Sequence, residues 1–200
     1  MPDYQYEKAA LLRGFNCICG VDEAGRGPLA GPVCAAAVIL RPDTVIDGLD
    51  DSKKLTEKKR EALFDIIKEK AEAYAVAFGT PEEIERFNIL EATFIAMNRA
   101  VEALTVKADY AIIDGNRAPG NIKIPCETVV KGDSKSMSVA AASVLAKVTR
   151  DRLMLEYDKK YPQYNFKKHK GYGTKEHIEL LHKFGPCEIH RLSFLKNILG

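Results

Sequence analysis

Short apolar runs alternate along the chain with longer segments in which apolar residues recur every three or four positions. Apolar runs bounded by Gly, Pro or charged residues are typical of buried strands, and the longer spacing is typical of helices. The predicted strands cover residues 17–22, 33–40, 74–78, 110–113 and 122–130. The predicted helices follow Thr56 and Thr80 and cover residues 90–104, 136–157 and 174–184, before a short apolar segment at 192–199.

Local signals mark several helix starts. Thr56 precedes apolar positions with helical spacing, and Thr80-Pro81-Glu82-Glu83 combines an N-cap, a first-turn Pro and a Glu three residues after the cap. The order of the elements favours an α/β fold in which helices cover both faces of a mixed sheet. We find no repeat, low-complexity tract or linker, so a single domain over residues 1–200 is predicted.

Composition excludes several classes of protein. Hydrophobic residues make up 46% of the 200 residues and charged residues 29%, which is typical of a soluble globular domain. The longest apolar stretch, residues 33–40, is too short to span a bilayer. The N-terminus carries acids and no apolar segment, so we expect no secretory signal, no membrane association and a cytoplasmic location.

The cysteines indicate thiols in a reducing compartment. They form an odd set without a Cys-x-x-Cys pair, and most lie within apolar runs, which predicts that they are buried. Cys17 and Cys19 have the spacing of one strand face, but no nearby residues complete a zinc site. The five are Cys17, Cys19, Cys34, Cys126 and Cys187.

Basic residues are concentrated toward the C-terminus, where residues 150–200 contain eleven Lys and Arg against six Asp and Glu. This charge is consistent with a bound polyanion or with solvated helix faces, and charge alone favours the latter. The loop at residues 167–173 supports a bound polyanion more strongly than charge alone does. It interleaves basic side chains with Tyr172, which lies between two glycines. A tyrosine in this setting can stack on a base or sugar, so the pattern favours nucleic acid over a solvated loop.

Four acidic residues could form a metal site. Asp22 and Glu23 follow one predicted strand and Asp114 ends another, so Asp22 and Asp114 converge if these strands are adjacent and parallel. Asp133 precedes the helix predicted over residues 136–157 and could complete a two-metal site for phosphodiester hydrolysis. Oxygen ligands select Mg²⁺ or Mn²⁺ over zinc. Taken singly, each acid is better explained as an ordinary turn residue than as a metal ligand.

Two polar loops could bind phosphate or sugar. Gly25-Arg26-Gly27 places a cation between residues that allow close backbone approach, although the motif taken alone favours a plain tight turn. Asp51-Ser52-Lys53-Lys54 lies at a helix entrance, where phosphate binding and capping are both favourable.

The long helix carries a polar face amid small residues. Ser143, Lys147 and Arg150 are spaced four and three apart and share this face, whereas Arg150 or Asp151 could simply form a surface ion pair. His177, His182 and His190 lack metal-ligand spacing and are interpreted as surface or core residues.

Six ordered blocks together closely resemble bacterial ribonuclease HII, over residues 17–195. They are GVDEAGRGPLAGP at 20–32, DSKKL at 51–55, DG at 114–115, KGD at 131–133, AASVLAKVTRD at 141–151 and HKGYGT at 169–174. The resemblance implies a ribonuclease H-like fold, with a mixed five-stranded sheet flanked by helices and a small helical C-terminal part. Residues 160–200 would form this part and join the substrate cleft.

The resemblance also implies an endonuclease that cuts the RNA strand of RNA–DNA hybrids and incises duplex DNA 5′ to an embedded ribonucleotide. Two Mn²⁺ or Mg²⁺ ions would be held by Asp22, Glu23, Asp114 and Asp133. The loop Gly25-Arg26-Gly27 and Tyr172 would read the 2′-hydroxyl and the junction. Other substrate-binding positions implied are Ser52, Lys53, Ser143, Lys147, His169 and Lys170.

The expected partners are the RNA–DNA hybrid and ribonucleotide-containing duplex DNA, bound by a monomer. No C-terminal sliding-clamp peptide is visible, so clamp binding is not implied. One alternative is another ribonuclease H-like nuclease, such as a junction resolvase, but Gly25-Arg26-Gly27 beside the first acid argues against it. A second alternative is a hybrid-binding module without catalytic activity. The presence of all four acids argues against this alternative.

Overall fold

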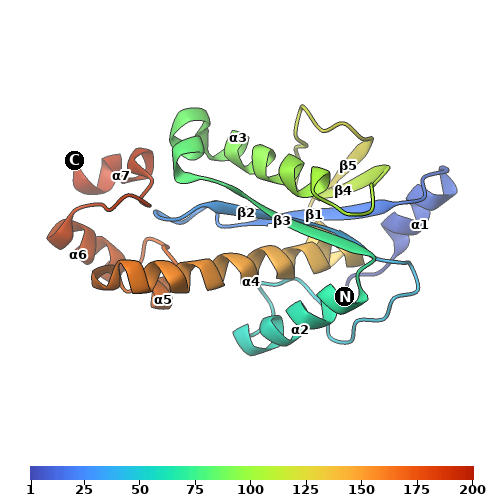
Figure 1. Ribbon diagram of the computed structural model, residues 1–200, viewed down its shortest axis with the longest axis horizontal. Coiled ribbons are helices and arrows are strands. Elements are labelled where there is room, and N and C mark those ends of the chain that lie inside the picture. Colours follow the sequence, from blue (N-terminus) through green and yellow to red (C-terminus); the bar gives the residue numbers. More distant parts are fainter.

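The computed structural model describes residues 1–200, which form a mixed five-stranded sheet covered by helices on both faces (Figure 1). The strand order is β3-β2-β1-β4-β5. Strand β1 pairs antiparallel with β2 and parallel with β4, so it lies at the centre of the sheet. The strands are β1 (Ile18–Ala24), β2 (Val33–Ile39), β3 (Ala73–Gly79), β4 (Tyr110–Asp114) and β5 (Cys126–Val129). The predicted mixed sheet is confirmed.

Seven α-helices and two short 3-10 turns complete the chain (Figure 1). Helix α3 covers one face of the sheet, and α2 and α4 cover the other. None of the helices combines the length and apolar character that a membrane-spanning segment requires. The helices are α1 (Gln5–Leu12), α2 (Glu57–Lys70), α3 (Pro81–Glu102), α4 (Met137–Lys160), α5 (Phe166–His169), α6 (Lys175–Phe184) and α7 (Leu192–Leu199), and the 3-10 turns are η1 (Gly132–Ser134) and η2 (Pro162–Tyr164).

Strand β2 contributes to the apolar core on both faces. Its side chains alternate, so that Cys34, Ala36 and Val38 face α4 while Ala35 and Ala37 face α3. All seven residues of the strand are buried, which explains why the strand appears in the sequence as a continuous apolar run.

Helix α4 lies unusually close to the central strand. A Cβ atom at Gly20 would lie 2.2 Å from the backbone carbonyl carbon of Ser138, so only glycine fits there. The alanines in the first half of the helix also permit close packing, and Ala140, Ala141 and Ala142 are all fully buried. This contact brings the first turns of α4 beside the polar end of β1.

The predicted helix starts are confirmed. Thr56 caps α2 by accepting a hydrogen bond from the Lys59 amide, and Thr80 forms a capping box with Glu83. The two helices predicted after Thr80 and over residues 90–104 run on as α3 with a kink at Asn88, whose φ of 74° is left-handed. The Asn88 side chain accepts from the Leu90 amide and so caps the second half.

Three elements differ from the sequence predictions. Strand β5 covers only Cys126–Val129, because the residues before it form turns and Pro125 has no amide to donate. Helix α5 occupies part of the predicted basic loop. Helix α1 was not predicted and has little amphipathic character. It is held in place by the buried Glu7, whose carboxylate accepts from the Ser136 hydroxyl at 2.6 Å and the Ser138 amide at 3.0 Å.

The C-terminal elements pack around the end of α4 and form a small apolar cluster of their own. This cluster joins the C-terminal part to the loop between β1 and β2 through Leu29 and Ala30. All five cysteines are free thiols, but only Cys19 and Cys34 are buried, so the prediction of buried thiols was wrong for the other three.

Candidate active site

Three carboxylates meet where two parallel strands end. Asp22 lies near the end of β1 and Asp114 ends β4, which pairs with β1 in parallel register. Asp133 lies on η1, directly before α4. One carboxylate oxygen from each residue lies within 4.8 Å of the others, so the predicted convergence of Asp22 and Asp114 is confirmed.

The environment of these carboxylates opposes their ionisation. Burial raises the pKa of Asp22 well above its usual range, and the negative charges of Glu23 and Asp114 raise it further. Burial also raises the pKa of Asp133, although the Lys53 ammonium partly offsets that effect. Close, buried like charges are costly unless a cation lies among them. Oxygen ligands in this arrangement therefore fit a hard divalent cation such as Mg²⁺ or Mn²⁺.

Backbone and side-chain contacts hold the carboxylates in place. The Gly132 amide donates to Asp114 Oδ1 at 2.6 Å, and the Glu23 amide donates to Asp22 Oδ1 at 2.7 Å. Lys53 Nζ donates to Asp133 Oδ2 at 3.2 Å. Each of the three carboxylates therefore has at least one hydrogen bond that holds it in place.

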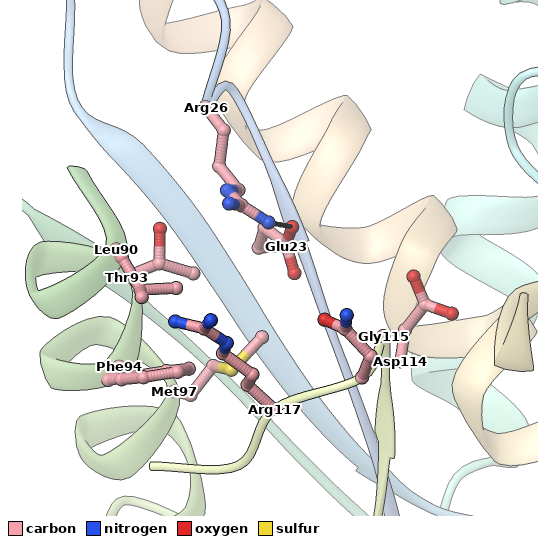
Figure 2. Close-up of a pocket in the computed structure, with 10 residues that line it drawn as sticks. Glu23, Arg26, Leu90, Thr93, Phe94, Met97, Asp114, Gly115 and Arg117 are labelled. Carbon is pink, nitrogen blue, oxygen red and sulfur yellow. Dashed lines mark hydrogen bonds and ion pairs between the residues drawn. The ribbon is translucent and has the colours of Figure 1, made fainter. Parts of the chain in front are cut away.

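Glu23 lies beside this group but is not part of it. Strand alternation directs the side chain of Glu23 to the opposite side from that of Asp22. Its carboxylate lies 3.4 Å from Arg26 Nη1, and burial raises its pKa while Arg26 lowers it. Figure 2 shows this pair above Asp114, in a cavity of about 280 Å³ that Arg117 also lines.

Most of the predicted substrate-binding residues line a second cavity of about 230 Å³ beside the carboxylates. The loop after β1 forms one wall, the start of α4 forms another, and the exposed ring of Tyr172 contributes from the C-terminal part. The predicted residues that line it are Asp22, Glu23, Gly25, Arg26, Gly27, Ser52, Lys53, Asp114, Ser143, Lys147 and Tyr172. The structure thus brings together residues that are up to 150 positions apart in the sequence.

Polar contacts order the walls of this cavity. The hydroxyls of Ser52 and Ser143 are hydrogen-bonded at 2.8 Å, and both residues are buried. Lys147 Nζ lies 2.8 Å from Asp151 and 5.9 Å from the centre of the Tyr172 ring. Asp151 therefore forms an ion pair, as the sequence allowed for Arg150 or Asp151. The pair is partly buried rather than on the open surface.

His169 and Lys170 do not line the cavity. His169 is buried, its Nε2 contacts the Tyr164 carbonyl at 2.8 Å, and its Nδ1 accepts from the Gly171 amide. Lys170 has a left-handed backbone, and its ammonium binds the Lys167 carbonyl. Both side chains turn toward the C-terminal part itself, so the substrate contacts that the resemblance implies for them stay a prediction.

Three histidines form a buried group in the C-terminal part. His169 stacks on His177 with ring centres 4.3 Å apart, and His177 Nε2 lies 3.1 Å from His190 Nε2. Burial lowers the pKa of both His177 and His190 to about 4. They are core residues, as one of the two sequence interpretations held, and stay neutral near pH 7.

Two fully buried arginines support the site from behind. Arg150 donates to three backbone carbonyls, so the interpretation of Arg150 as part of a surface ion pair was wrong. Arg191, which sequence reasoning did not single out, donates to the carbonyls of Gly25, Arg26 and Gly31. A single Arg near the C-terminus provides no local signal of such a role, because its partners lie about 160 residues away.

The sheet order and the acids at the ends of its parallel strands define a ribonuclease H-like α/β protein. The ribonuclease HII family profile matches residues 19–197. The chain belongs to the ribonuclease HII family, whose members are endoribonucleases that cleave the RNA of RNA–DNA hybrids.

Individual relatives agree with this assignment. A ribonuclease HII from Caldicellulosiruptor bescii is 55% identical over 98% of this chain and 95% of its own length. One from Idiomarina loihiensis is 61% identical over 88% of this chain and 94% of its own. Among solved structures, the ribonuclease H2 of Pyrococcus horikoshii OT3 is similar with a TM-score of 0.75 and 27% identity, covering 92% of this chain and 97% of that one.

Proposed function

We propose that this endoribonuclease incises duplex DNA on the 5′ side of an embedded ribonucleotide, in addition to cutting the RNA strand of hybrids. The observation that carries the proposal is the shared cavity, in which Asp22, Glu23 and Asp114 lie beside the Gly25-Arg26-Gly27 loop and Tyr172. Hydrolysis of the phosphodiester and recognition of the sugar can then take place at neighbouring parts of one nucleotide. Such an activity would serve the removal of ribonucleotides from replicated DNA.

The carboxylates are suited to hold two divalent ions, Mn²⁺ or Mg²⁺, during hydrolysis. Asp22, Asp114 and Asp133, whose oxygens converge, would supply ligands, and Glu23, which lies outside this group but lines one cavity with Asp22 and Asp114, would complete the set. Bound in this way, the ions would activate water and stabilise the leaving oxygen. Water would form a bond to phosphorus and lose a proton, while the bond to the preceding 3′-oxygen breaks and that oxygen takes up a proton, which would leave a 5′-phosphate and a 3′-hydroxyl.

The residues around the carboxylates would position the strand. Lys53 and Lys147 lie at the cavity edge and provide positive charge for backbone phosphates. The ammonium of Lys170 lies outside the cavity, so Lys170 would contact backbone phosphates further along the duplex. Ser52 and Ser143 support the catalytic wall through their mutual hydrogen bond, and His169 supports the loop that carries Tyr172.

Recognition of the ribonucleotide would fall to the glycine loop and Tyr172. The closest side-chain atom to a Cβ built at Gly27 is Tyr172 Cε1, at 3.9 Å, so the two lie side by side. The ring can pack on the sugar at the junction while the loop backbone contacts the 2′-hydroxyl. In this proposal, residues 160–200 form part of the substrate cleft because they carry Tyr172.

The same features favour a monomer acting in the cytoplasm. Every residue of the proposed cleft comes from one chain, so a second copy is not required to complete it. The free cysteines are consistent with a reducing compartment.

A panel of substrates tests this proposal. Purified protein with Mn²⁺ is incubated with an RNA–DNA hybrid, a DNA duplex containing one ribonucleotide, and a four-way DNA junction. We expect cleavage of the first two and none of the junction. Cleavage of the junction would favour a resolvase, and binding of the hybrid without cleavage of any substrate would favour a silent binding module.

A further inference from the structure

The loop that would read the ribonucleotide is held from behind by the guanidinium of Arg191. Arg191 Nη2 donates to the Gly25 carbonyl at 2.6 Å, Nη1 donates to the Arg26 carbonyl at 2.8 Å, and Nε donates to the Gly31 carbonyl at 2.9 Å. Arg191 is fully buried and does not line the cavity in front of the loop. The two consecutive carbonyls of the loop therefore point into the protein.

This arrangement determines which backbone groups face outward. The chain contains no cis peptide bond, and in a trans peptide the C=O and N–H groups point in opposite directions. With the carbonyls of Gly25 and Arg26 turned toward Arg191, the amides of Arg26 and Gly27 point away from it. Neither amide donates a hydrogen bond within the chain. The loop, which lines the cavity, thus offers two unpaired donors on its side away from Arg191.

Arg150 holds the same loop in a conformation that requires glycine. Gly25 has a φ of +95°, and a Cβ atom there would lie 2.0 Å from Arg150 Nε. Arg150 also donates to the carbonyls of Ala30, Pro32 and Lys170, each at 3.0 Å. Through these bonds Arg150 links the end of the loop after β1 to the segment that carries Tyr172.

Burial of two guanidinium groups without a carboxylate partner lowers the stability of the folded state. Neither Arg150 nor Arg191 forms an ion pair with an acid, and burial lowers the pKa of both, that of Arg191 to about 9. Burying charge in this way destabilises a protein unless hydrogen bonds compensate. Six backbone carbonyls provide that compensation, and all of them belong to the loop after β1 or to the Tyr172 segment.

We propose that Arg191 is a positioning residue for ribonucleotide recognition, which orients the Gly25 and Arg26 peptides so that the Arg26 and Gly27 amides face the substrate as donors. The proposal rests on the function proposed above. The ligand group is an oxygen acceptor on the sugar, the 2′-hydroxyl, which only a ribonucleotide presents. The C-terminal part would thus contribute to substrate discrimination without contacting the metal ligands.

The test compares binding with and without the 2′-hydroxyl. Affinities are measured in Ca²⁺, used to bind the duplex without cutting it, for two duplexes of one sequence, one all-DNA and one with a single ribonucleotide. The variant is Arg191→Lys. Lysine keeps the positive charge, but its single ammonium cannot bridge two neighbouring carbonyls as the planar guanidinium of arginine does. The control is Arg99→Lys, because Arg99 also donates to a backbone carbonyl, that of Phe78, but on α3 away from the site.

We expect the wild type and Arg99→Lys to prefer the ribonucleotide duplex. Arg191→Lys should reduce that preference about tenfold, the loss equivalent to one hydrogen bond, while its affinity for the all-DNA duplex and for Mn²⁺ stays the same. Equal loss of affinity for both duplexes, or an unchanged preference, would overturn the role of Arg191. No preference in the wild type would instead overturn the proposed ribonucleotide recognition.

A second measurement does not depend on the folding of the variant. Hydrogen exchange of the wild-type amides of Arg26 and Gly27 should be fast in the free protein and in the all-DNA complex, because neither has an acceptor within the chain. Exchange should slow in the complex with the ribonucleotide duplex. Equal protection in both complexes, or none in either, would contradict the proposed orientation.

Discussion

Asp22 and Asp114 lie on neighbouring parallel strands, and carboxylate oxygens of the two residues come within 4.8 Å of each other. The distance follows from the pairing of β1 with β4, because the register that pairs Val21 with Ile113 places the next residue of each strand side by side. Two ionised carboxylates this close repel each other, and a bound cation relieves the repulsion. The pair therefore links the topology of the sheet to the chemistry of the site.

Substitution of Asp114 by Asn should abolish most of the activity and leave the fold intact. The amide keeps the shape of the side chain but removes one charged ligand, so the cleavage rate should fall by about a hundredfold or more. Thermal stability without metal should stay the same or rise, because repulsion with Asp22 is relieved. Single-turnover kinetics and thermal melting measure both effects. Turnover of Asp114→Asn near that of the wild type would contradict the assignment of the metal ligands.

The C-terminal part should become unstable in mild acid. His177 and His190 have pKa values of about 4 in the folded chain, below the ordinary value of 6.5 for an exposed histidine. The unfolded chain therefore binds more protons between pH 6.5 and 4, and the free energy of unfolding should decrease as the pH falls through this window. The loss should reach about 1–2 kcal/mol per histidine near pH 5.

Urea denaturation at pH 7.5 and pH 5 measures this decrease. His190→Gln should weaken the pH dependence, whereas His182→Gln, a change at an exposed position of α6, should leave it unchanged. A pH dependence that is identical in all three proteins would show that the buried histidines do not cause it.

Affinity for nucleic acid should decrease steeply with salt. Neutralising a phosphate releases counterions, so each contact contributes about 0.9 to the slope of log affinity against log salt. Lys53→Gln should reduce the slope by about that amount, because Lys53 lines the cavity beside the carboxylates. Lys123→Gln is the matched control, since Lys123 pairs with Glu102 on another part of the surface. Equal slopes for Lys53→Gln and the wild type would place Lys53 away from the phosphates.

Tyr172 should affect recognition more than chemistry. The residue is 42% exposed, its ring lies beside Gly27 and it is not a metal ligand, so stacking on the substrate is its main available contribution. Tyr172→Ala should lose roughly 1–3 kcal/mol of binding, with a larger effect on a single embedded ribonucleotide than on a long hybrid that offers many registers. Tyr172→Phe should lie between the wild type and Tyr172→Ala.

Steady-state kinetics on the two substrates, together with Mn²⁺ titration, separate the possible roles of Tyr172. The affinity for Mn²⁺ should be unchanged in both variants. Equal losses on both substrates, or weaker metal binding, would show that Tyr172 supports the catalytic centre or the fold.

Local patterns predicted most of the fold, because the relevant interactions are between residues close in sequence. The caps at Thr56 and Thr80 and the alternation of apolar segments are of this kind. Helix α1 could not be predicted in this way, since it depends on the contact of Glu7 with the start of α4, about 130 residues away.

The candidate site was predicted to a similar extent and for similar reasons. Convergence of Asp22 and Asp114 followed from their positions at strand ends once the strands were assumed to be adjacent and parallel. The burial of His169 and the contacts of Arg191 depend on how the C-terminal part folds back onto the loop after β1. Spacing in the sequence does not contain that information.

The central claim is that carboxylates at these strand ends direct water to the phosphate on the 5′ side of a ribonucleotide. The most direct test maps the products from a duplex with one embedded ribonucleotide, in Mn²⁺, in Mg²⁺ and in excess EDTA. The account predicts a cut 5′ to the ribonucleotide, with 3′-hydroxyl and 5′-phosphate ends, in the presence of either metal and none in EDTA. Cleavage in EDTA, or a cut on the 3′ side that leaves a 2′,3′-cyclic phosphate, would contradict it, because the latter product requires attack by the 2′-hydroxyl instead of water.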